Sequence, residues 1–273
     1  MDKKFIKTYL EEYPEVSKPF KKNLIKEYLQ IFALSFIYSK KKYRDLIFYG
    51  GSCLKYCFGL ERLSEDLDFV DLKKKINLED LKNELVVFFE KEFNLKIKAK
   101  IQKFRIYFKF PILKKLELAE KGESDFLYLK IEIFKKFNFC SSFKIKIIPV
   151  FKIGKSILIR TFDLPTLMAT KIRAILYRKW EKTDKKGKVF IKAKGRDYYD
   201  LMWYLEKKIK PNLKCIEKIK TKKILKEKLL EIVKKIDQKS IRLDLESLIK
   251  DQNFIKDLSK NLKEILIEKI KEI

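Results

Sequence analysis

Two aspartates, Asp66 and Asp68, occupy alternate positions in a short run that is otherwise apolar. Because side chains alternate along a strand, both carboxylates would face one side while their apolar neighbours face a core. Carboxylates this close repel each other unless a cation lies between them. Mg²⁺ prefers such hard oxygen ligands together with substrate phosphates. The pair therefore predicts a Mg²⁺ site, with Mn²⁺ as the alternative ion.

A Gly-Gly-Ser turn precedes the aspartates. An apolar strand predicted over residues 45–49 runs into Gly50 and Gly51, and a helix predicted to start at Ser52 ends at Gly59. Glycine lets the backbone approach a phosphate closely. The first N–H groups of a helix attract anions. This arrangement predicts a cradle for a triphosphate.

A third carboxylate, Glu132, stands in an alternating run over residues 127–134 whose opposite face is apolar. On a strand next to the aspartates it would complete a two-metal site, in which one ion activates the attacking hydroxyl and the other holds the triphosphate. The presence of Glu123 and Lys130 in the same region leaves open which acidic residue is the third metal ligand. Each motif alone is common in ordinary turns and exposed strands, but the ordered combination favours a functional site.

Several classes of chemistry are excluded or disfavoured by residue types. The chain has no His, which excludes Ser-His-Asp catalysis and His-ligated zinc. The four cysteines form no Cys-x-x-Cys pair, so we expect small core residues and no sign of an oxidising compartment. They are Cys53, Cys57, Cys140 and Cys215.

The charge of the chain is strongly positive, with 66 basic and 38 acidic residues and a formal net charge of +28. Such a field attracts polyanions. Most of the basic residues are Lys spread over every segment, so the charge permits nucleic-acid binding without proving it. A basic loop over residues 182–195, which includes Phe190, would lie along an RNA backbone or be simply exposed.

The N-terminus has no apolar segment of signal-peptide length, and no apolar run reaches the roughly 18 residues of a membrane span. We therefore expect a cytoplasmic protein without a membrane partner. Hydrophobic residues make up 46% of the chain, enough for a real core.

Hydrophobic periodicity predicts a mixed first half and a helical second half. The proposed domains are residues 1–160 and 161–273, without a Gly/Pro/Ser-rich linker between them. The predicted strands cover residues 45–49, 64–70, 105–110, 127–134 and 156–161, and the predicted helices cover residues 20–40, 52–58, 77–94, 165–176, 196–208 and much of the chain after Pro211.

Three ordered motifs resemble the AbiEii/AbiGii toxin family, which belongs to the DNA polymerase β-type nucleotidyltransferase superfamily. They are the stretch over residues 50–69, a Lys-bearing helix over residues 167–174 and an Arg-Asp-x-x-Asp motif over residues 194–201. The resemblance spans roughly residues 48 to 205. It implies an α+β fold: a polymerase β-like mixed-sheet domain with N-terminal helices, then an all-helical domain that completes the active site.

The resemblance also implies residue roles. Lys171 would neutralise phosphate charge, and Asp197 would be a further essential acid. Asp197 and Asp200 share a helix face, although Asp197 could instead stabilise a helix start and Asp200 could be an ion-paired acid. The full nucleotide-binding set is Gly50, Gly51, Ser52, Arg62, Lys171 and Arg196; the metal set is Asp66, Asp68 and Glu132; the catalytic set adds Lys171 and Asp197 to the metal set.

The expected activity is transfer of a nucleoside monophosphate from an NTP to an acceptor hydroxyl, with a tRNA 3′ end as the expected acceptor. Family members are toxins of toxin–antitoxin or phage-defence systems, so a cognate antitoxin is an expected partner. Two alternatives stay open: an enzyme that nucleotidylates a protein or small molecule, and a nucleotide- or RNA-binding module without turnover.

Overall fold

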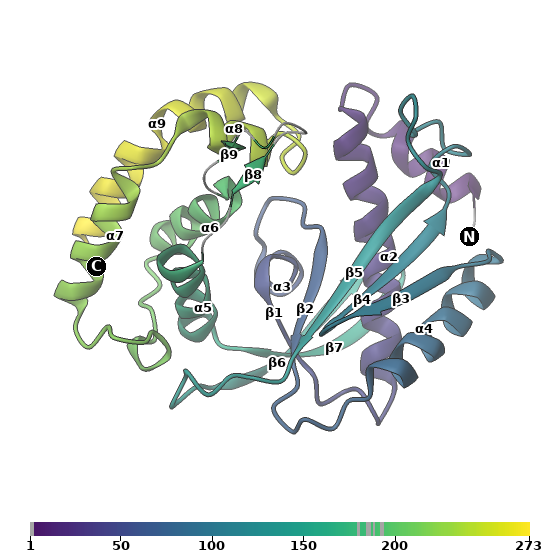
Figure 1. Ribbon diagram of the computed structural model, residues 1–273, viewed down its shortest axis with the longest axis horizontal. Helices are drawn as coiled ribbons and strands as arrows, with labels where there is room; N and C mark the ends of the chain where they lie inside the picture. The colour runs from purple at the N-terminus through teal and green to yellow at the C-terminus, as the bar shows by residue number, and fades with distance from the viewer. Residues whose placement is uncertain (1–2, 179–180, 184–186, 188, 192–193) are drawn as a thin grey trace. The chain divides into compact units, whose positions relative to one another are not determined.

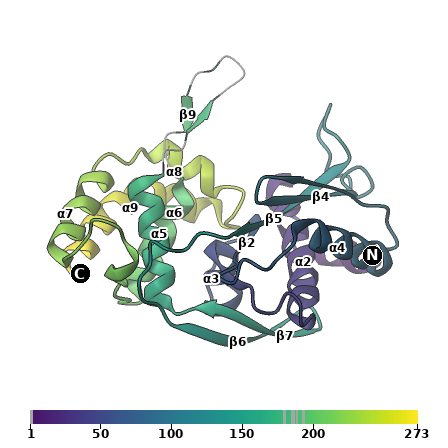
Figure 2. The ribbon, with the colours of Figure 1, turned by 60° about the horizontal axis from the view of Figure 1, so that its bottom comes forward.

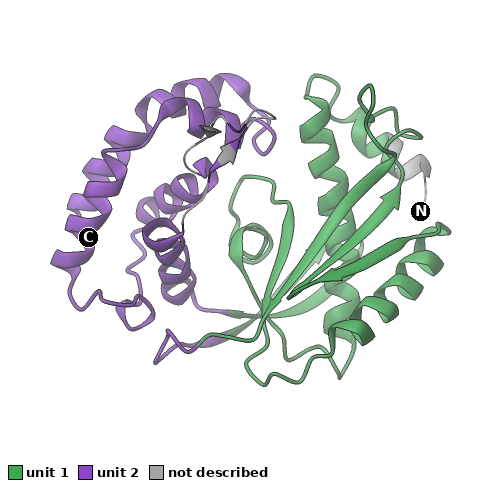
Figure 3. Ribbon diagram, viewed as in Figure 1, with its two compact units in different colours: residues 1–137, 146–161 green, residues 138–145, 162–273 purple. Residues whose placement is uncertain are grey.

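The computed structural model describes residues 3–178, 181–183, 187, 189–191 and 194–273. The chain divides into two compact units, coloured separately in Figure 3: residues 1–137 with 146–161, and residues 138–145 with 162–273. Residues 138–145 thus lie with the second unit. The domain division proposed at residue 160 stays a prediction.

A mixed seven-stranded sheet, counted over the described residues, forms the centre of the first unit, with strand order β3-β4-β5-β2-β1-β7-β6 (Figure 1). β2 runs parallel to β5 and antiparallel to β1, while β4 is antiparallel to both β3 and β5. This confirms the predicted α+β class. The strands are β1 (Ile47–Tyr49), β2 (Asp66–Val70), β3 (Lys98–Gln102), β4 (Arg105–Pro111), β5 (Phe126–Phe134), β6 (Ile145–Lys152) and β7 (Lys155–Phe162).

The helices of the first unit are α1 (Lys3–Glu11), α2 (Lys18–Ser39), α3 (Gly50–Phe58) and α4 (Leu78–Phe93). Helix α2 starts where the Ser17 hydroxyl accepts the Phe20 N–H, and α4 starts where the Asn77 side chain accepts the Glu79 and Asp80 N–H groups. Such caps satisfy N–H groups that lack intrahelical partners. The predicted helices over residues 20–40 and 77–94 are confirmed.

Helices α2 and α4 pack against β3, β4 and β5. The strand side chains directed at these helices are fully buried and apolar, as alternation predicts. Burial of this apolar area stabilises the unit. These side chains include Ile106, Phe108, Phe110, Leu129 and Ile131.

The second unit is mostly helical, and its helices α5, α6, α8 and α9 lie together (Figure 2). Its helices are α5 (Leu164–Tyr177), α6 (Gly195–Glu206), α7 (Lys222–Val233), α8 (Gln238–Leu245) and α9 (Gln252–Lys271), with a 3-10 turn at Leu213–Cys215. The described part of the chain contains no helix long and apolar enough to cross a bilayer.

The all-helical expectation for the second half needs one correction. A short antiparallel hairpin, β8 (Lys182–Thr183) and β9 (Val189–Ile191), lies within the predicted basic loop. Pairing between strands this short depends on their turn, and neither strand shows an alternating pattern long enough to predict it. Other parts of that loop (residues 184–186, 188 and 192–193) lie outside the described residues, as does the side chain of Phe190.

A disulfide between Cys140 and Cys215 corrects the expectation that the four cysteines are only core residues. Both belong to the second unit, although 75 residues separate them in sequence. Spacing along the chain cannot reveal such a pairing, because it depends on the fold bringing the loop over residues 138–145 to the 3-10 turn. Cys53 and Cys57 are free, and Cys53 is fully buried.

Gly195, at the start of α6, lies against the backbone of α8 at Ile241. A Cβ atom there would lie 2.8 Å from the backbone Cα and carbonyl oxygen of Ile241. Because backbone atoms cannot move aside cheaply, Gly195→Ala should lower the free energy of unfolding by about 1–3 kcal/mol. Urea unfolding followed by circular dichroism measures this, with the exposed Lys223→Ala as control. Equal midpoints for the two variants would contradict the packing argument.

Candidate active site

Two neighbouring rows of side chains cross one face of the sheet in the first unit. Residues paired across strands point to the same face, so the strand register determines which side chains are neighbours. One row runs through Tyr49, Asp68, Glu132 and Arg105 on β1, β2, β5 and β4, and the next through Asp66, Lys130 and Tyr107 on β2, β5 and β4. The structure thus places the three predicted carboxylates on one face and on adjacent strands.

Lys130 joins two of these carboxylates. Its Nζ lies 2.9 Å from Asp66 Oδ2 and 2.6 Å from Glu132 Oε1. Arg105 Nε donates to the same Glu132 oxygen at 2.9 Å. Glu132 is therefore held by two cations, whereas Glu123, the other candidate for the third acid, pairs with Lys22 at 2.6 Å. No sequence pattern marks Lys130 or Arg105 as a counter-ion of these carboxylates, although Lys130 alternates with Glu132 along one strand.

The charge network shifts the titration of its members. Burial raises the pKa of Asp66, and the positive charge of Lys130 only partly opposes this. Burial by itself would lower the pKa of Lys130, but the charges of Asp66 and Glu132 raise it. Lys130 therefore stays protonated and serves as the internal counter-ion of the carboxylates.

The donor set is compatible with a magnesium ion at the two aspartates. No three acidic or cysteine side chains within the described residues cluster tightly enough to hold a metal by themselves, since Lys130 stands between Asp66 and Glu132. Mg²⁺ usually takes only one or two protein carboxylates and completes its shell with water and substrate phosphates. Asp66 and Asp68 can supply those oxygens, with Glu132 in the neighbouring position on β5.

Gly50 brings the chain against Asp68. Its φ is +82°, and a Cβ atom at this position would lie 2.4 Å from Asp68 Oδ2. Helix α3 begins here, two residues before the predicted start at Ser52, because the glycine turn already has helical hydrogen bonding. Tyr49, the residue before the helix, makes no side-chain cap. The first N–H groups of α3 therefore receive no capping oxygen from that residue.

Ser52 and Arg62, both predicted to bind nucleotide, hold the turn in place. The Ser52 hydroxyl is fully buried and donates to the Asp66 carbonyl. Arg62 is 2% exposed, donates to the Leu63 carbonyl at 2.8 Å and packs where a Cβ on Gly51 would fall. In this structure these side chains tie α3 to the segment before β2. Their predicted contact with nucleotide stays a prediction.

The second unit contains its own cluster of charges. Lys171 Nζ on α5 lies 2.9 Å from Asp197 Oδ1 and 2.7 Å from Asp200 Oδ2, both on α6. Arg178 donates to the other Asp197 oxygen at 2.5 Å. The motifs over residues 167–174 and 194–201 thus meet in the second unit. For Asp200, the structure shows the ion-paired arrangement.

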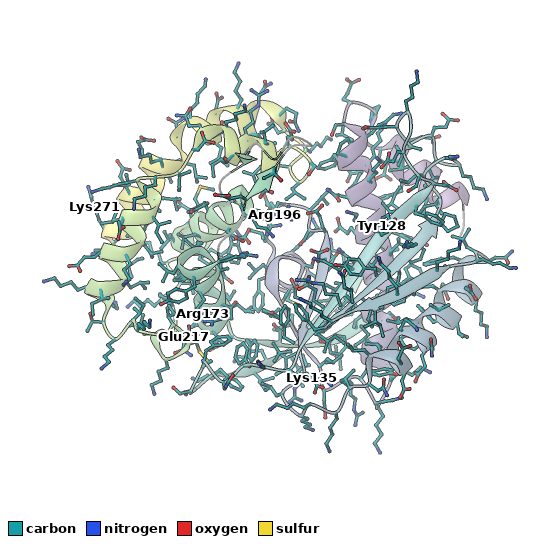
Figure 4. The ribbon with its side chains drawn as sticks, in the orientation of Figure 1. Tyr128, Lys135, Arg173, Arg196, Glu217 and Lys271 are labelled. Carbon is teal, nitrogen blue, oxygen red and sulfur yellow. A yellow bond between two sulfur atoms is a disulfide. The ribbon has the colours of Figure 1, made fainter. Side chains whose placement is uncertain are left out.

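Asp163 positions the lysine of this cluster, because its side chain accepts the Thr166 N–H and starts α5 next to Pro165. Arg196 is engaged differently. Its main-chain N–H and its guanidinium donate to Asp244 on α8, at 3.0 Å and 3.1 Å (Figure 4). The Asp244 side chain is fully buried. Its pairing with Arg196 was not predicted, because no local sequence pattern marks an acidic residue on α8 as a partner of α6.

Figure 4 also labels Arg173 and Glu217, which form a bidentate ion pair. Its guanidinium carbon lies 3.3 Å from the centre of the Phe139 ring. This contact attaches the loop over residues 138–145 to α5 within the second unit.

The charges around Asp197 determine its titration. Burial alone would raise the pKa of Asp197, but the charges of Lys171 and Arg178 lower it from 3.8 to about 2. Burial and the charges of Arg178 and Arg196 lower the pKa of Lys194. Positive charge is thus concentrated around one buried carboxylate.

The lowered pKa of Asp197 predicts a pH-dependent stability. A carboxylate with a depressed pKa stabilises the fold above its unfolded pKa, and this contribution of about 2 kcal/mol disappears as the pH falls from about 4 through about 2. Asp197→Asn should therefore lower the free energy of unfolding strongly at pH 7, where Lys171 and Arg178 lose their partner, and less at pH 3. Urea unfolding at pH 7, 5, 4 and 3 measures the gap.

The exposed Asp257→Asn is the matched control and should show a small gap at every pH. A gap for Asp197→Asn that stayed constant from pH 7 to pH 3 would contradict the assigned charge interaction.

The chain is similar to a known protein family in sequence and to solved proteins in fold. A sequence model of the family described as "Nucleotidyl transferase AbiEii toxin, Type IV TA system" matches residues 37–271. No curated protein sequence matches the chain. The nucleotidyltransferase toxin MenT4 from Mycobacterium tuberculosis is similar in structure at 10% identity and a TM-score of 0.56, over 95% of this chain and 89% of that one.

JHP933 from Helicobacter pylori is 18% identical, with a TM-score of 0.47 over 94% of this chain and 96% of that one. At these identities the likeness to MenT4 supports the fold alone. The family match covers most of the sequence and confirms the resemblance stated from the three motifs. The chain belongs to the AbiEii family of nucleotidyltransferases, toxins of type IV toxin–antitoxin systems.

Proposed function

We propose that this nucleotidyltransferase moves a nucleoside monophosphate from an NTP to an acceptor hydroxyl, with a tRNA 3′ end as acceptor and Mg²⁺ as cofactor. The observation that carries the proposal is the contact between the start of α3 and the carboxylate row: Gly50 lies directly against Asp68. An anion-binding helix start and a cation-binding carboxylate pair are thus adjacent. A magnesium nucleoside triphosphate needs both.

The triphosphate would bind at the start of α3. The absence of side chains on Gly50 and Gly51 lets the Asp68 carboxylate and the Arg62 guanidinium lie against the turn. Phosphate oxygens would bind the backbone N–H groups of this turn beside them. Asp66 and Asp68 would hold Mg²⁺, which when bound polarises the phosphate and stabilises the leaving pyrophosphate. Mn²⁺ is the alternative ion.

The reaction forms a bond from the acceptor oxygen to the α-phosphorus and breaks the bond from that phosphorus to the oxygen bridging to the β-phosphorus. Pyrophosphate leaves with that bridging oxygen, and the hydroxyl proton passes to a carboxylate or to water. Lys130 and Arg105, held on Glu132, supply positive charge beside the row. Their charge limits the repulsion among the carboxylates before substrate binds.

Lys171 would contribute further positive charge toward substrate phosphates. Asp197 and Asp200 fix its ammonium group, so Asp197 would act by positioning Lys171. In the cell, the protein would act as the toxin of a toxin–antitoxin pair with a role in phage defence. A cognate antitoxin would be its partner and the cytoplasm its compartment.

The test is incubation of the purified protein with Mg²⁺, total tRNA and each α-³²P-labelled NTP in turn, resolved on a denaturing gel. The wild type should label tRNA with a preferred nucleotide. Asp66→Asn with Asp68→Asn should reduce labelling at least about 100-fold, because losing the metal removes several kcal/mol of transition-state stabilisation. Chelation by EDTA should have the same effect, and the exposed Asp257→Asn should leave labelling unchanged.

Other outcomes identify the alternatives. Label on a protein or small molecule in a cell extract, with none on tRNA, would identify a different acceptor. Absence of label on every acceptor, together with toxicity that persists in the Asp66→Asn/Asp68→Asn variant, would indicate a nucleotide- or RNA-binding module. Labelling that persists in EDTA would refute the role of the metal.

A further inference from the structure

The face of β3, β4 and β5 opposite α2 and α4 carries interleaved basic and aromatic side chains. We call this set the basic–aromatic face: Lys98, Lys100, Tyr107, Lys109, Phe126 and Tyr128. Lys98, Lys100 and Tyr128 are exposed. The side chain of Tyr128, labelled in Figure 4, belongs to a residue that is 41% exposed to solvent. The remaining members are partly exposed. Three rings and three lysines thus share one exposed or partly exposed sheet surface.

The strand register makes this a continuous surface. Lys98 pairs with Lys109, and Lys109 pairs with Tyr128, so one row crosses three strands. The next row pairs Lys100 with Tyr107 and Tyr107 with Lys130. Because alternate residues of these strands are buried under α2 and α4, the side chains of the two rows must point the other way.

The lysines lie over the rings of the same face. Lys109 Nζ is 5.4 Å from the Tyr128 ring centre and 6.0 Å from that of Phe126. Lys98 lies 5.8 Å from Phe126, and Lys100 lies 5.9 Å from Tyr107. Cation–π contacts at exposed sites and at this range contribute only about 0.5–1 kcal/mol each. A phosphate can therefore draw a lysine away from a ring, and a base can then stack on the ring.

The face has almost no negative charge of its own. The sequences of β3 and β4 contain no acidic residue, and the single acid of β5, Glu132, is paired with Arg105 and Lys130. The positive potential of the lysines is therefore not cancelled locally. Such a surface attracts a polyanion rather than another copy of this strongly basic chain.

We propose that the basic–aromatic face binds a single-stranded polynucleotide, with phosphates on the lysines and bases stacked on Tyr128 and Tyr107. Open sheets with exposed aromatic residues stack unpaired bases, and basic side chains between them follow the backbone. A duplex hides the flat surfaces of its bases, so it could use only the lysines. The pairing of charge with rings is what selects a single strand.

The face leads directly to the candidate active site. Tyr107 neighbours Lys130, which neighbours Asp66, and Tyr128 lies about 13 Å from Glu132 along β5, four residues at roughly 3.3 Å each. A polynucleotide bound on this face would therefore end beside the carboxylates. That the bound strand is the acceptor rests on the proposed function, whereas binding itself does not.

The test is fluorescence anisotropy of labelled 12-nucleotide RNA and DNA single strands with the full-length protein, in EDTA and without NTP. Lys98→Ala/Lys100→Ala/Lys109→Ala should weaken binding at least about tenfold in 0.1 M salt. It should also flatten the slope of log affinity against log salt by about 2, since each phosphate contact contributes about 0.7 for single strands. Comparing RNA with DNA identifies which sugar the face prefers.

The matched control is Lys41→Ala/Lys75→Ala/Lys91→Ala, which removes the same charge from exposed positions outside the face. It should weaken binding by less than about threefold. Equal losses in the two triple variants would overturn the proposal and leave only the general charge of the chain. Thermal unfolding should be similar for both, because all six lysines lie on the surface.

A second pair of variants tests stacking. Tyr128→Ala should weaken single-strand binding about 5- to 100-fold, the range of one base–aromatic stack. Phe151→Ala, which removes a ring that is 73% exposed on β6 and outside the face, should leave binding unchanged. Equal effects of these two substitutions, or duplex RNA binding as tightly as a single strand, would refute stacking.

Failure of this proposal can be distinguished from failure of the proposed function. Binding that depends on the face without any transfer to RNA would retain the site and reject the RNA acceptor. Transfer to tRNA with an unchanged KM for tRNA in the Lys98/Lys100/Lys109 variant would retain the function and reject the site.

Discussion

The glycine with the tightest surroundings in the first unit is Gly50. A Cβ atom there would lie 2.4 Å from a carboxylate oxygen of Asp68. Only glycine tolerates both that distance and the positive φ. The approach requires α3 to begin at the end of β1 while β2 runs alongside. The buried Ser52 hydroxyl then fastens the first turn of α3 to the Asp66 carbonyl. One steric condition thus brings the start of α3 against a pair of carboxylates.

Charge balance follows from this geometry. Carboxylates on one sheet face need counter-ions when no substrate is bound, and Lys130 and Arg105 provide them from the neighbouring strands. In the second unit the charges are exchanged, because two carboxylates, Asp197 and Asp200, surround the single ammonium group of Lys171. In both places the ion pairs leave functional groups in fixed positions at the cost of partial neutralisation. In the first unit, the proposed magnesium nucleotide would replace these internal partners.

Local patterns in the sequence predicted much of this structure. Contacts between segments that lie far apart in the chain could not be predicted from those patterns. The alternation in β5 and the shared face of the aspartates are properties of a few consecutive residues, and the structure shows them as expected. The ion pair of Arg196 with Asp244, the disulfide of Cys140 with Cys215 and the edge strand β3 depend on register and packing between segments far apart. Residue types at short spacing carry no record of such contacts.

The same limitation explains why the basic–aromatic face escaped sequence analysis. Lysines occur in every segment of this chain, so alternation of Lys with aromatic residues in a single strand predicts nothing specific. The signal appears only when the register places Lys98, Lys109 and Tyr128 in one row across three strands. That row is parallel to the one through Tyr107, Lys130 and Asp66. One sheet face therefore changes from cations and rings to carboxylates within two strands, which is the order that a polynucleotide end and a metal-bound triphosphate would require.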